Sequence, residues 1–269
     1  MGNFRNVLHY PGSGLFTVAF FAYLYLPIAV VVAFSFNANR IVSVWTGFSL
    51  KWYGNALHNE NLMNAVWTSL TIALIASVLA TIVALMAALV LARPRKVRFA
   101  GLSETVVNLP LLLPEIVLAV ATLIVFSQLG IANGMVRLII AHTTFCIPFA
   151  YLPIRARLLG LESEFEEASQ DLYANKWVTF HRVTLPLILP GVFAGATLAF
   201  VISMDDFITS NMLSSGGTTT LPVYIFGLIR QGTTPELNAI SSLIILISIG
   251  LAAVALTISA RSGKTKNPD

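Results

Sequence analysis

The 269-residue sequence is poor in charge, because Asp, Glu, Lys and Arg together make up only 10% of it. A soluble domain carries about 25% of these residues. Hydrophobic types account for 57% of the chain. This balance excludes a soluble enzyme, a disordered chain and a nucleic-acid-binding domain as leading interpretations. The formal net charge of +4 comes from 16 basic and 12 acidic residues, so the positions of the basic residues are more informative than their number.

Residue types that serve catalysis and metal binding are equally scarce. The single cysteine, Cys146, excludes a disulfide framework, and its apolar neighbours indicate an inert thiol. The four histidines are scattered, and no His-Glu-x-x-His motif occurs. Gly263-Lys264-Thr265 resembles the end of a phosphate-binding loop, but Ile258 stands where that motif needs a glycine. We therefore expect no metal site and no energy-converting site on this chain.

Long apolar runs are abundant, and six of them reach the length of about 20 residues that a membrane helix needs. They cover residues 15–36, 62–92, 105–129, 134–154, 183–204 and 237–260. The third run is the least regular, because Pro110 and Pro114 interrupt it and Glu115 adds a carboxylate. Proline there predicts a kinked or broken helix. The first run is too long for a signal-peptide core. We expect an all-α membrane protein with six transmembrane helices.

Basic residues predict the orientation of these helices, because cytoplasmic loops are enriched in Lys and Arg. With the N-terminus in the cytoplasm, 12 of the 16 basic residues lie inside, and only four lie outside: Arg40, Lys51, Arg137 and Arg230. We therefore expect both termini in the cytoplasm. The predicted organisation is a first helix with its outer loop (1–61), a five-helix core (62–260) and a basic tail (261–269).

The predicted inner loop, residues 155–182, has an amphipathic pattern. Its apolar residues recur every three or four positions and so share one helical face: Leu161, Phe165, Ala168 and Leu172. Acidic residues fill most of the positions between them. Ser163 and Glu166 form a Ser-x-x-Glu capping box that predicts the start of this helix, and a break is expected near Asn175.

This helix is acidic, whereas amphipathic helices that lie on lipid usually carry Lys and Arg. The inner leaflet is itself anionic, so an acidic helix is not attracted to it. The pattern favours docking into another protein, and the alternative is a folded loop without a partner.

Glu167-Ala168-Ser169-x-x-Leu172, followed by Phe180 and Leu185-Pro186, resembles the EAA loop of ABC importer permeases. Residues 62–260 are similar to the six-span, type I permease layout of that family. Five further motifs, in chain order, resemble spermidine/putrescine permeases: Pro27, Pro114-Glu115-Ile116-Val117, Ser203-Met204-Asp205-Asp206, Thr220-Leu221-Pro222 and Pro235-Glu236-Leu237-Asn238-Ala239.

The resemblance implies a permease subunit in a bacterial inner membrane that imports a polyamine or another small organic solute. Its implied partners are a second, different permease, two cytosolic ATPase subunits that hold ATP and Mg, and a soluble solute-binding protein. In that family the EAA loop is a coupling helix seated in the ATPase, which implies this role for six residues: Phe165, Glu167, Ala168, Ser169, Leu172 and Tyr173. A self-contained secondary transporter or channel remains the alternative from another class, and Glu115 alone is thin support for it.

Two residues depart from the family pattern, which usually has alanine at Ser169 and glycine at Tyr173. Glycine would allow a positive φ at the turn after the coupling helix. A tyrosine in left-handed geometry costs about 1–2 kcal/mol. We therefore expect the left-handed residue to move to Asn175, which tolerates this conformation better.

Three carboxylates lie in or beside the apolar runs, where ionisable groups are costly. Glu115 either faces the translocation pathway, where it can meet a cationic amine, or caps the first turn of a helix that begins after Pro110. Asp205 and Asp206 either mark a helix end or form a negative mouth to the pathway. Because a helix C-terminus disfavours anions, the first alternative leaves their position unexplained.

The fifth run also carries a ridge of small residues spaced four apart: Gly191, Gly195, Ala199 and Ser203. Such a ridge lets another helix approach closely. It predicts close packing, either within the subunit or against a partner.

Overall fold

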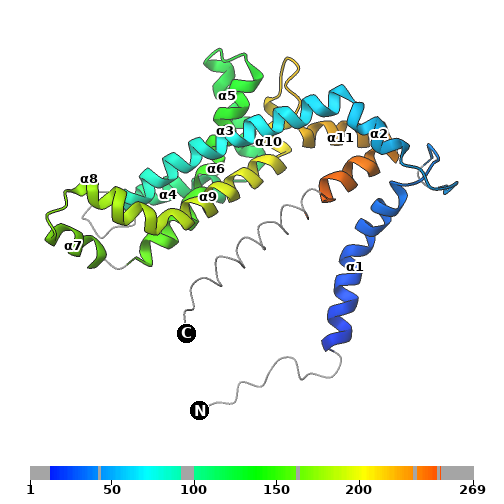
Figure 1. Cartoon of the computed structure of the whole chain (residues 1–269). Helices are drawn as coiled ribbons and strands as arrows, with labels where there is room; N and C mark the ends of the chain where they lie inside the picture. The colour runs from blue at the N-terminus through cyan, green and yellow to red at the C-terminus, as the bar shows by residue number, and fades with distance from the viewer. Residues whose placement is uncertain are drawn as a thin grey trace. The chain divides into compact units, whose positions relative to one another are not determined.

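The computed structural model describes residues 13–41, 44–91, 100–161, 164–232, 235–246 and 249. Within these ranges the chain is almost wholly helical, and its only strand-like pairing is an isolated bridge between Asn37 and Phe48 (Figure 1). The helices are α1 (Ser13–Phe34), α2 (Lys51–His58), α3 (Glu60–Leu91), α4 (Ala100–Leu112), α5 (Glu115–Gln128), α6 (Gly134–Leu159), α7 (Glu164–Asp171), α8 (Lys176–Thr179), the π-helix η2 (Phe180–Thr184), α9 (Leu185–Asp205), α10 (Ile208–Leu213) and α11 (Leu221–Gln231). A further helix covers Pro235–Leu246.

Among the described residues, four helices are long and apolar enough to cross a membrane: Gly14–Phe34, Glu60–Leu91, Gly134–Leu159 and Lys176–Asp205. The predicted third span is a pair of helices, α4 and α5, whose axes differ by 106°. The predicted break near Pro114 is therefore confirmed. The sixth predicted run is helical up to Leu246, and most of its remainder lies outside the described residues, as does the basic tail. The prediction of an all-α membrane protein is confirmed.

The chain divides into two compact units, residues 61–224 and residues 1–60 with 225–269. In the first unit, α3, α6 and α9 lie side by side and share a core in which most of the buried residues are small (Figure 1). The buried members of this core are Ala80, Ala84 and Ala88 of α3, Cys146, Ala150, Tyr151 and Ile154 of α6, and Ala199 of α9. Small side chains allow the three helices to pack backbone against backbone, as apolar helices in lipid require.

The small-residue ridge of α9 packs against α6 of the same chain. A Cβ added at Gly191 would lie 2.7 Å from Cβ of Arg157, and one added at Gly195 would lie 2.6 Å from the carbonyl oxygen of Ala150. Both distances are too short for real atoms, so these two glycines are needed for the contact. The structure therefore places the ridge inside the unit.

The other unit contains the loop between α1 and α2, which Asn37 organises. Its buried side chain donates to the carbonyl of Val44 at 2.8 Å and accepts from the backbone N–H of Asn39 and of Thr46. The indole N–H of Trp52 donates to the Asn37 carbonyl at 2.8 Å. In the same unit, the Asn59 amide donates to the Glu236 carboxylate at 3.0 Å. Several side-chain hydrogen bonds therefore hold the described part of this loop together.

Candidate functional site

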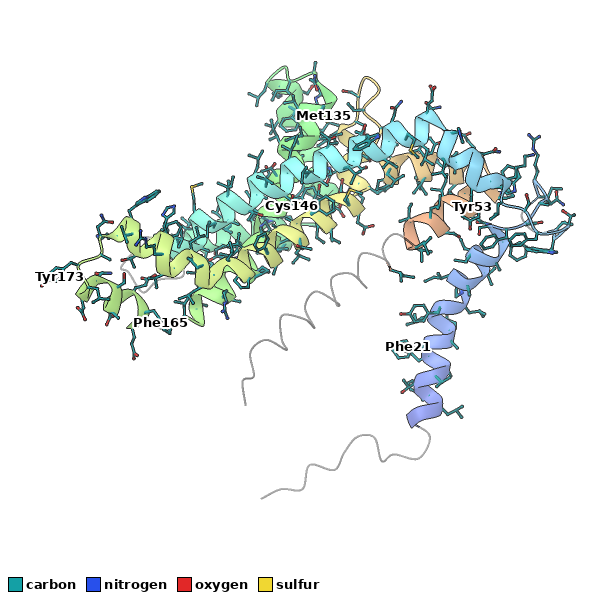
Figure 2. All side chains as sticks on the ribbon, in the orientation of Figure 1. Phe21, Tyr53, Met135, Cys146, Phe165 and Tyr173 are labelled. Carbon is teal, nitrogen blue, oxygen red and sulfur yellow. The ribbon has the colours of Figure 1, made fainter. Side chains whose placement is uncertain are left out.

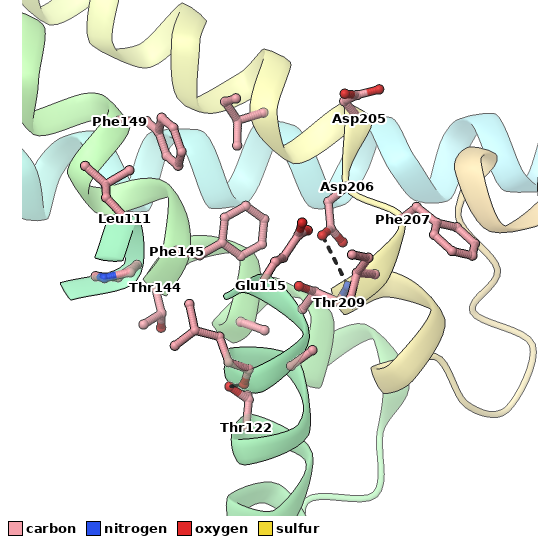
Figure 3. Close-up of a pocket in the computed structure, with 16 residues that line it drawn as sticks. Leu111, Glu115, Thr122, Thr144, Phe145, Phe149, Asp205, Asp206, Phe207 and Thr209 are labelled. Atoms are coloured by element: carbon pink, nitrogen blue, oxygen red, sulfur yellow. Dashed lines mark hydrogen bonds between the residues drawn. The ribbon is translucent and has the colours of Figure 1, made fainter. Parts of the chain in front are cut away.

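A cavity of about 570 Å³ opens where α4, α5, α6 and α9 meet the segment leading into α10. Three carboxylates line it: Glu115, Asp205 and Asp206. Three phenylalanine rings also line it: Phe145, Phe149 and Phe207. The remaining lining residues are apolar or threonine, and none of the described residues around it is Lys or Arg. The cavity therefore combines negative charge with apolar and aromatic walls (Figure 3).

Glu115 reaches the cavity because the chain breaks just before it. Pro114 has an extended backbone (φ −57°, ψ 133°), and Glu115 is the first residue of α5. A carboxylate is favourable at a helix N-terminus, where unpaired N–H groups give partial positive charge. Figure 3 shows the exposed Glu115 side chain directed toward Asp206. Glu115 therefore stands in the first turn of α5 and lines the cavity, whereas α4 continues through Pro110, so the expected helix start after Pro110 is wrong.

Asp206 is the buried carboxylate of the three. It follows the last residue of α9, and one of its oxygens accepts the backbone N–H of Thr209 at 3.2 Å (Figure 3). The other oxygen accepts the backbone N–H of Ser210 at 2.7 Å. These N–H groups belong to the first turn of α10, a helix that the sequence analysis did not predict. The position of an acidic residue after a helix C-terminus is thereby explained, since Asp206 caps the next helix.

His142 of α6 is the buried partner of Asp206, and its Nε2 lies 3.3 Å from Asp206 Oδ2. The same ring contacts Ser203 Oγ at 2.7 Å through Nδ1 and Ser210 Oγ at 3.2 Å through Nε2. The His142 side chain therefore links α9, through Ser203, to α10, through Ser210, and to Asp206 between the two helices. No sequence motif marks this residue, although a histidine within an apolar span is itself a signal that a buried partner exists.

Asp205 differs from Asp206 although it is adjacent in sequence. It is the exposed last residue of α9, and Figure 3 shows it pointing away from Glu115 and Asp206. The three predicted pathway carboxylates therefore share one cavity but not one environment. Asp206 is bound within the protein, whereas Glu115 and Asp205 are exposed.

The second candidate site is the loop built from α7, α8 and η2 at the other end of α9. The predicted amphipathic helix is α7, and none of its residues is buried. Its apolar residues face outward, since Phe165 is 52% exposed and Leu172, just beyond its end, is 81% exposed (Figure 2). Glu167 and Ala168 are also exposed. The described residues of this chain therefore leave the apolar face of the loop uncovered.

The polar side of the loop binds the chain itself. Thr184 donates to the Glu166 carboxylate at 2.6 Å, and the hydroxyls of Ser169 and Thr179 lie 3.1 Å apart. Asn175 caps α8 by accepting the backbone N–H of Val178 at 2.9 Å. Ser163, the first residue of the predicted capping box, lies outside the described residues.

The prediction that Asn175 takes the left-handed conformation is wrong. Tyr173 has φ +62°, and Asn175 is extended at φ −75° and ψ 165°. Two hydrogen bonds explain this, from the N–H of Tyr173 to the Gln170 carbonyl and from the N–H of Ala174 to the Ser169 carbonyl. They form a Schellman motif, which requires its left-handed residue at the position that Tyr173 occupies.

The loop joins α9 through the π-helix η2. The N–H of Leu185 reaches back to the Phe180 carbonyl, and Pro186 follows at the start of α9. Proline has no N–H for the carbonyl four residues earlier, and its ring clashes with that carbonyl in an α-helix. The wider π turn before Pro186 accommodates this clash.

The fold and the two sites define a membrane component of a transport system. The sequence matches the family described as "Binding-protein-dependent transport system inner membrane component" over residues 80–262, and the chain belongs to that family. Members are transport components of the membrane rather than catalytic subunits.

The chain is 36% identical to the putrescine transport system permease protein PotI of Escherichia coli strain K12, over 93% of this chain and 91% of that protein. It is 38% identical to the spermidine/putrescine transport system permease protein PotC of Haemophilus influenzae, over 92% of this chain and 96% of that protein. Its fold resembles a chain of a bacterial ABC transporter involved in the import of the acidic polysaccharide alginate. For that chain the TM-score is 0.69 with 16% identity, over 92% of this chain and 94% of the other.

Proposed function

We propose that this chain is one permease subunit of an ATP-driven importer in a bacterial inner membrane, and that it forms half of the pathway for a polyamine. The observation that carries the solute assignment is the cavity, where carboxylates and phenylalanine rings meet without a lysine or arginine among the described lining residues. A polyamine joins ammonium groups through methylene chains. Carboxylates suit the ammonium groups, and phenylalanine faces attract cations through their quadrupole.

The fold alone does not decide the solute, because a transporter of an acidic polysaccharide has the same fold. The lining side chains therefore carry the distinction. The curated relatives named for putrescine and spermidine support the same assignment. Within this site, Glu115 and Asp205 are the carboxylates that meet the solute, because Asp206 is engaged by His142 and by the first turn of α10.

The uncovered apolar face of the α7 loop supports a separate motor protein. We assign Phe165, Glu167, Ala168 and Leu172 to docking on a cytosolic ATPase subunit, which carries ATP and Mg. Ser169 holds the loop to its own chain, and Tyr173 forms the turn that ends it. The loop and both termini then lie in the cytoplasm. The complete importer contains a second, different permease, two ATPase subunits and an external solute-binding protein.

The test is the reconstituted complex with its binding protein in proteoliposomes. Putrescine or spermidine should stimulate ATP hydrolysis and enter the vesicles, while a neutral sugar of similar size should do neither. Stimulation by the sugar without stimulation by any amine would contradict the assignment. Reconstitution of this chain alone tests the alternative of a self-contained transporter, and amine uptake driven by an ion gradient in that sample would replace our proposal.

Glu115→Gln tests the pathway role directly, because it removes the charge and keeps the shape. We expect uptake of putrescine to fall about tenfold, which corresponds to one favourable charged contact of about 1.4 kcal/mol. The matched control is Glu60→Gln at the start of α3, a residue outside the cavity lining. Equal uptake by wild type and Glu115→Gln would remove Glu115 from the pathway.

A further inference from the structure

A second polar cluster lies between α4 and α6, outside the cavity lining. Glu104 of α4 and Arg155 of α6 form an ion pair with an O–N distance of 2.8 Å. One helical turn along, Asn108 follows on α4 and Tyr151 precedes on α6. Tyr151 is completely buried, and its hydroxyl lies close enough to both charges of the pair to interact with them electrostatically.

Three buried polar atoms of this cluster have no hydrogen-bond partner in the described part of the chain: Asn108 Oδ1, the Tyr151 hydroxyl oxygen and Arg155 Nε. Buried polar groups are nearly always paired, because an unpaired one costs about 1–3 kcal/mol. The amide oxygen and the hydroxyl oxygen are both acceptors. They therefore suit a donor from outside the described residues.

The cluster continues the cavity along the same two helices. Thr144 lines the cavity, and Tyr151 and Arg155 follow it by 7 and 11 residues, which at about 100° per residue keeps all three within about 20° of one direction. On α4, Leu111 lines the cavity, and Glu104 precedes it by 7 residues on the same face. The ion pair lies toward the C-terminal end of α6, the end from which the chain leads into the α7 loop.

We infer that Glu104, Asn108 and Tyr151 form an inner subsite for an ammonium group of the solute, and that this group replaces Arg155 on Glu104 as the solute leaves the cavity. The inference rests on the proposed amine solute. Asn108 Oδ1 and the Tyr151 hydroxyl accept hydrogen bonds from the ammonium group, and Glu104 neutralises its charge. Arg155 closes the route when no solute is present.

The ion pair is suited to such an exchange. The side chains of Arg155 and Glu104 are 34% and 37% exposed, and only one guanidinium nitrogen, Nη2, is within reach of the carboxylate. Pairs of this exposure contribute little to stability, so a second cation can compete with the guanidinium. A bidentate, buried pair would resist displacement.

Arg155→Met tests the exchange, because it removes the competing cation and keeps an apolar stem. In the purified complex in nanodiscs, without the binding protein, we expect radiolabelled putrescine to bind about fivefold more tightly to this variant than to wild type. Adding Glu104→Gln should abolish the gain. Arg157→Met is the matched control, since Arg157 is also on α6 but donates to the Leu187 carbonyl of α9.

Tyr151→Phe is the second variant, and it removes only the hydroxyl from a buried ring. We expect proteoliposome uptake of putrescine to fall about fivefold, with one lost hydrogen bond, while Tyr23→Phe on α1 should match wild type. The inference is overturned if Arg155→Met binds putrescine as wild type does, or if Tyr151→Phe transports normally. In both cases uptake by wild type would continue. Absence of any amine uptake by wild type would instead overturn the proposed function.

Discussion

The two ends of α9 differ in what they bury and what they expose: one end buries ionisable side chains, and the other exposes large apolar ones. At the Asp205 end, the ionisable residues His142 and Asp206 are buried, and each has several partners. At the Leu185 end, large apolar side chains such as Leu172 and Trp177 are exposed, at 81% and 70%. Buried charge is costly unless it is paired, and exposed apolar surface is costly unless something covers it. The described chain therefore supplies the partners of the buried residues at the first end, whereas it leaves the apolar side chains at the second end uncovered.

Asp206→Ala should disrupt the buried polar contacts at the Asp205 end of α9 and have the largest effect on stability. It leaves His142 with only its serine contacts and two N–H groups of α10 without their acceptor, and each buried polar group left unpaired costs about 1–3 kcal/mol. We expect a marked fall in the thermal midpoint of the purified complex. Asp205→Ala, at the exposed neighbour, is the control. Equal midpoints for the two variants would mean that Asp206 does not hold the joint between α9 and α10.

Phe165→Ala combined with Leu172→Ala should remove the exposed apolar surface at the Leu185 end of α9 without destabilising the chain, because neither side chain is buried. If the loop docks in the ATPase, the loss should be about 2 kcal/mol, or roughly thirtyfold weaker binding of the ATPase to the purified permease pair. Transport should fall with it.

The matched control for this double variant is Phe48→Ala with Leu50→Ala, a pair of the same residue types that is exposed in the loop between α1 and α2. It should bind the ATPase as wild type does. Normal transport by the Phe165 and Leu172 variant would show that the loop does not couple the two proteins.

Most of the fold follows from sequence patterns that are local. Apolar runs of sufficient length give the spanning helices, Pro114 gives the break between α4 and α5, and the three-to-four spacing gives α7. The six residues of α10 show no such pattern, because a helix of fewer than two turns has no apolar periodicity to detect. Its existence depends on the Asp206 cap.

The sequence predicts which carboxylates belong to the candidate site, but it does not predict which residues they contact. The carboxylates stand out because charge is rare in an apolar run. The contact between His142 and Ser203 spans 61 residues, so no local pattern contains it. At Tyr173, by contrast, a local backbone motif overrides the preference of the individual residue. Residue preference favours Asn175 for a positive φ, but the end of α7 at Asp171 fixes which position the Schellman motif makes left-handed.

Tyr173→Gly should stabilise the α7 loop by relieving the backbone strain of the positive φ at this position. The left-handed tyrosine costs about 1–2 kcal/mol, and glycine returns part of this as unfolded-state entropy, so we expect the loop to gain about 1 kcal/mol. Slower hydrogen exchange at the amides of residues 164–180 would report it. Tyr173→Ala removes the same exposed ring and keeps the strain, so it should not slow exchange. Equal exchange in both variants would contradict strain at this turn.

Ser169→Ala should have the smallest effect, since it removes one partly buried hydrogen bond worth about 0.5–1.5 kcal/mol. Thr179→Val removes the same bond from the other side. If the Ser169–Thr179 contact holds α7 against α8, the two substitutions should not be additive, and the double variant should match the more damaging single one in hydrogen exchange of the loop. Additive effects would mean that each hydroxyl acts separately. The contact between α7 and the rest of the loop would then depend chiefly on the hydrogen bond from Thr184 of η2 to Glu166.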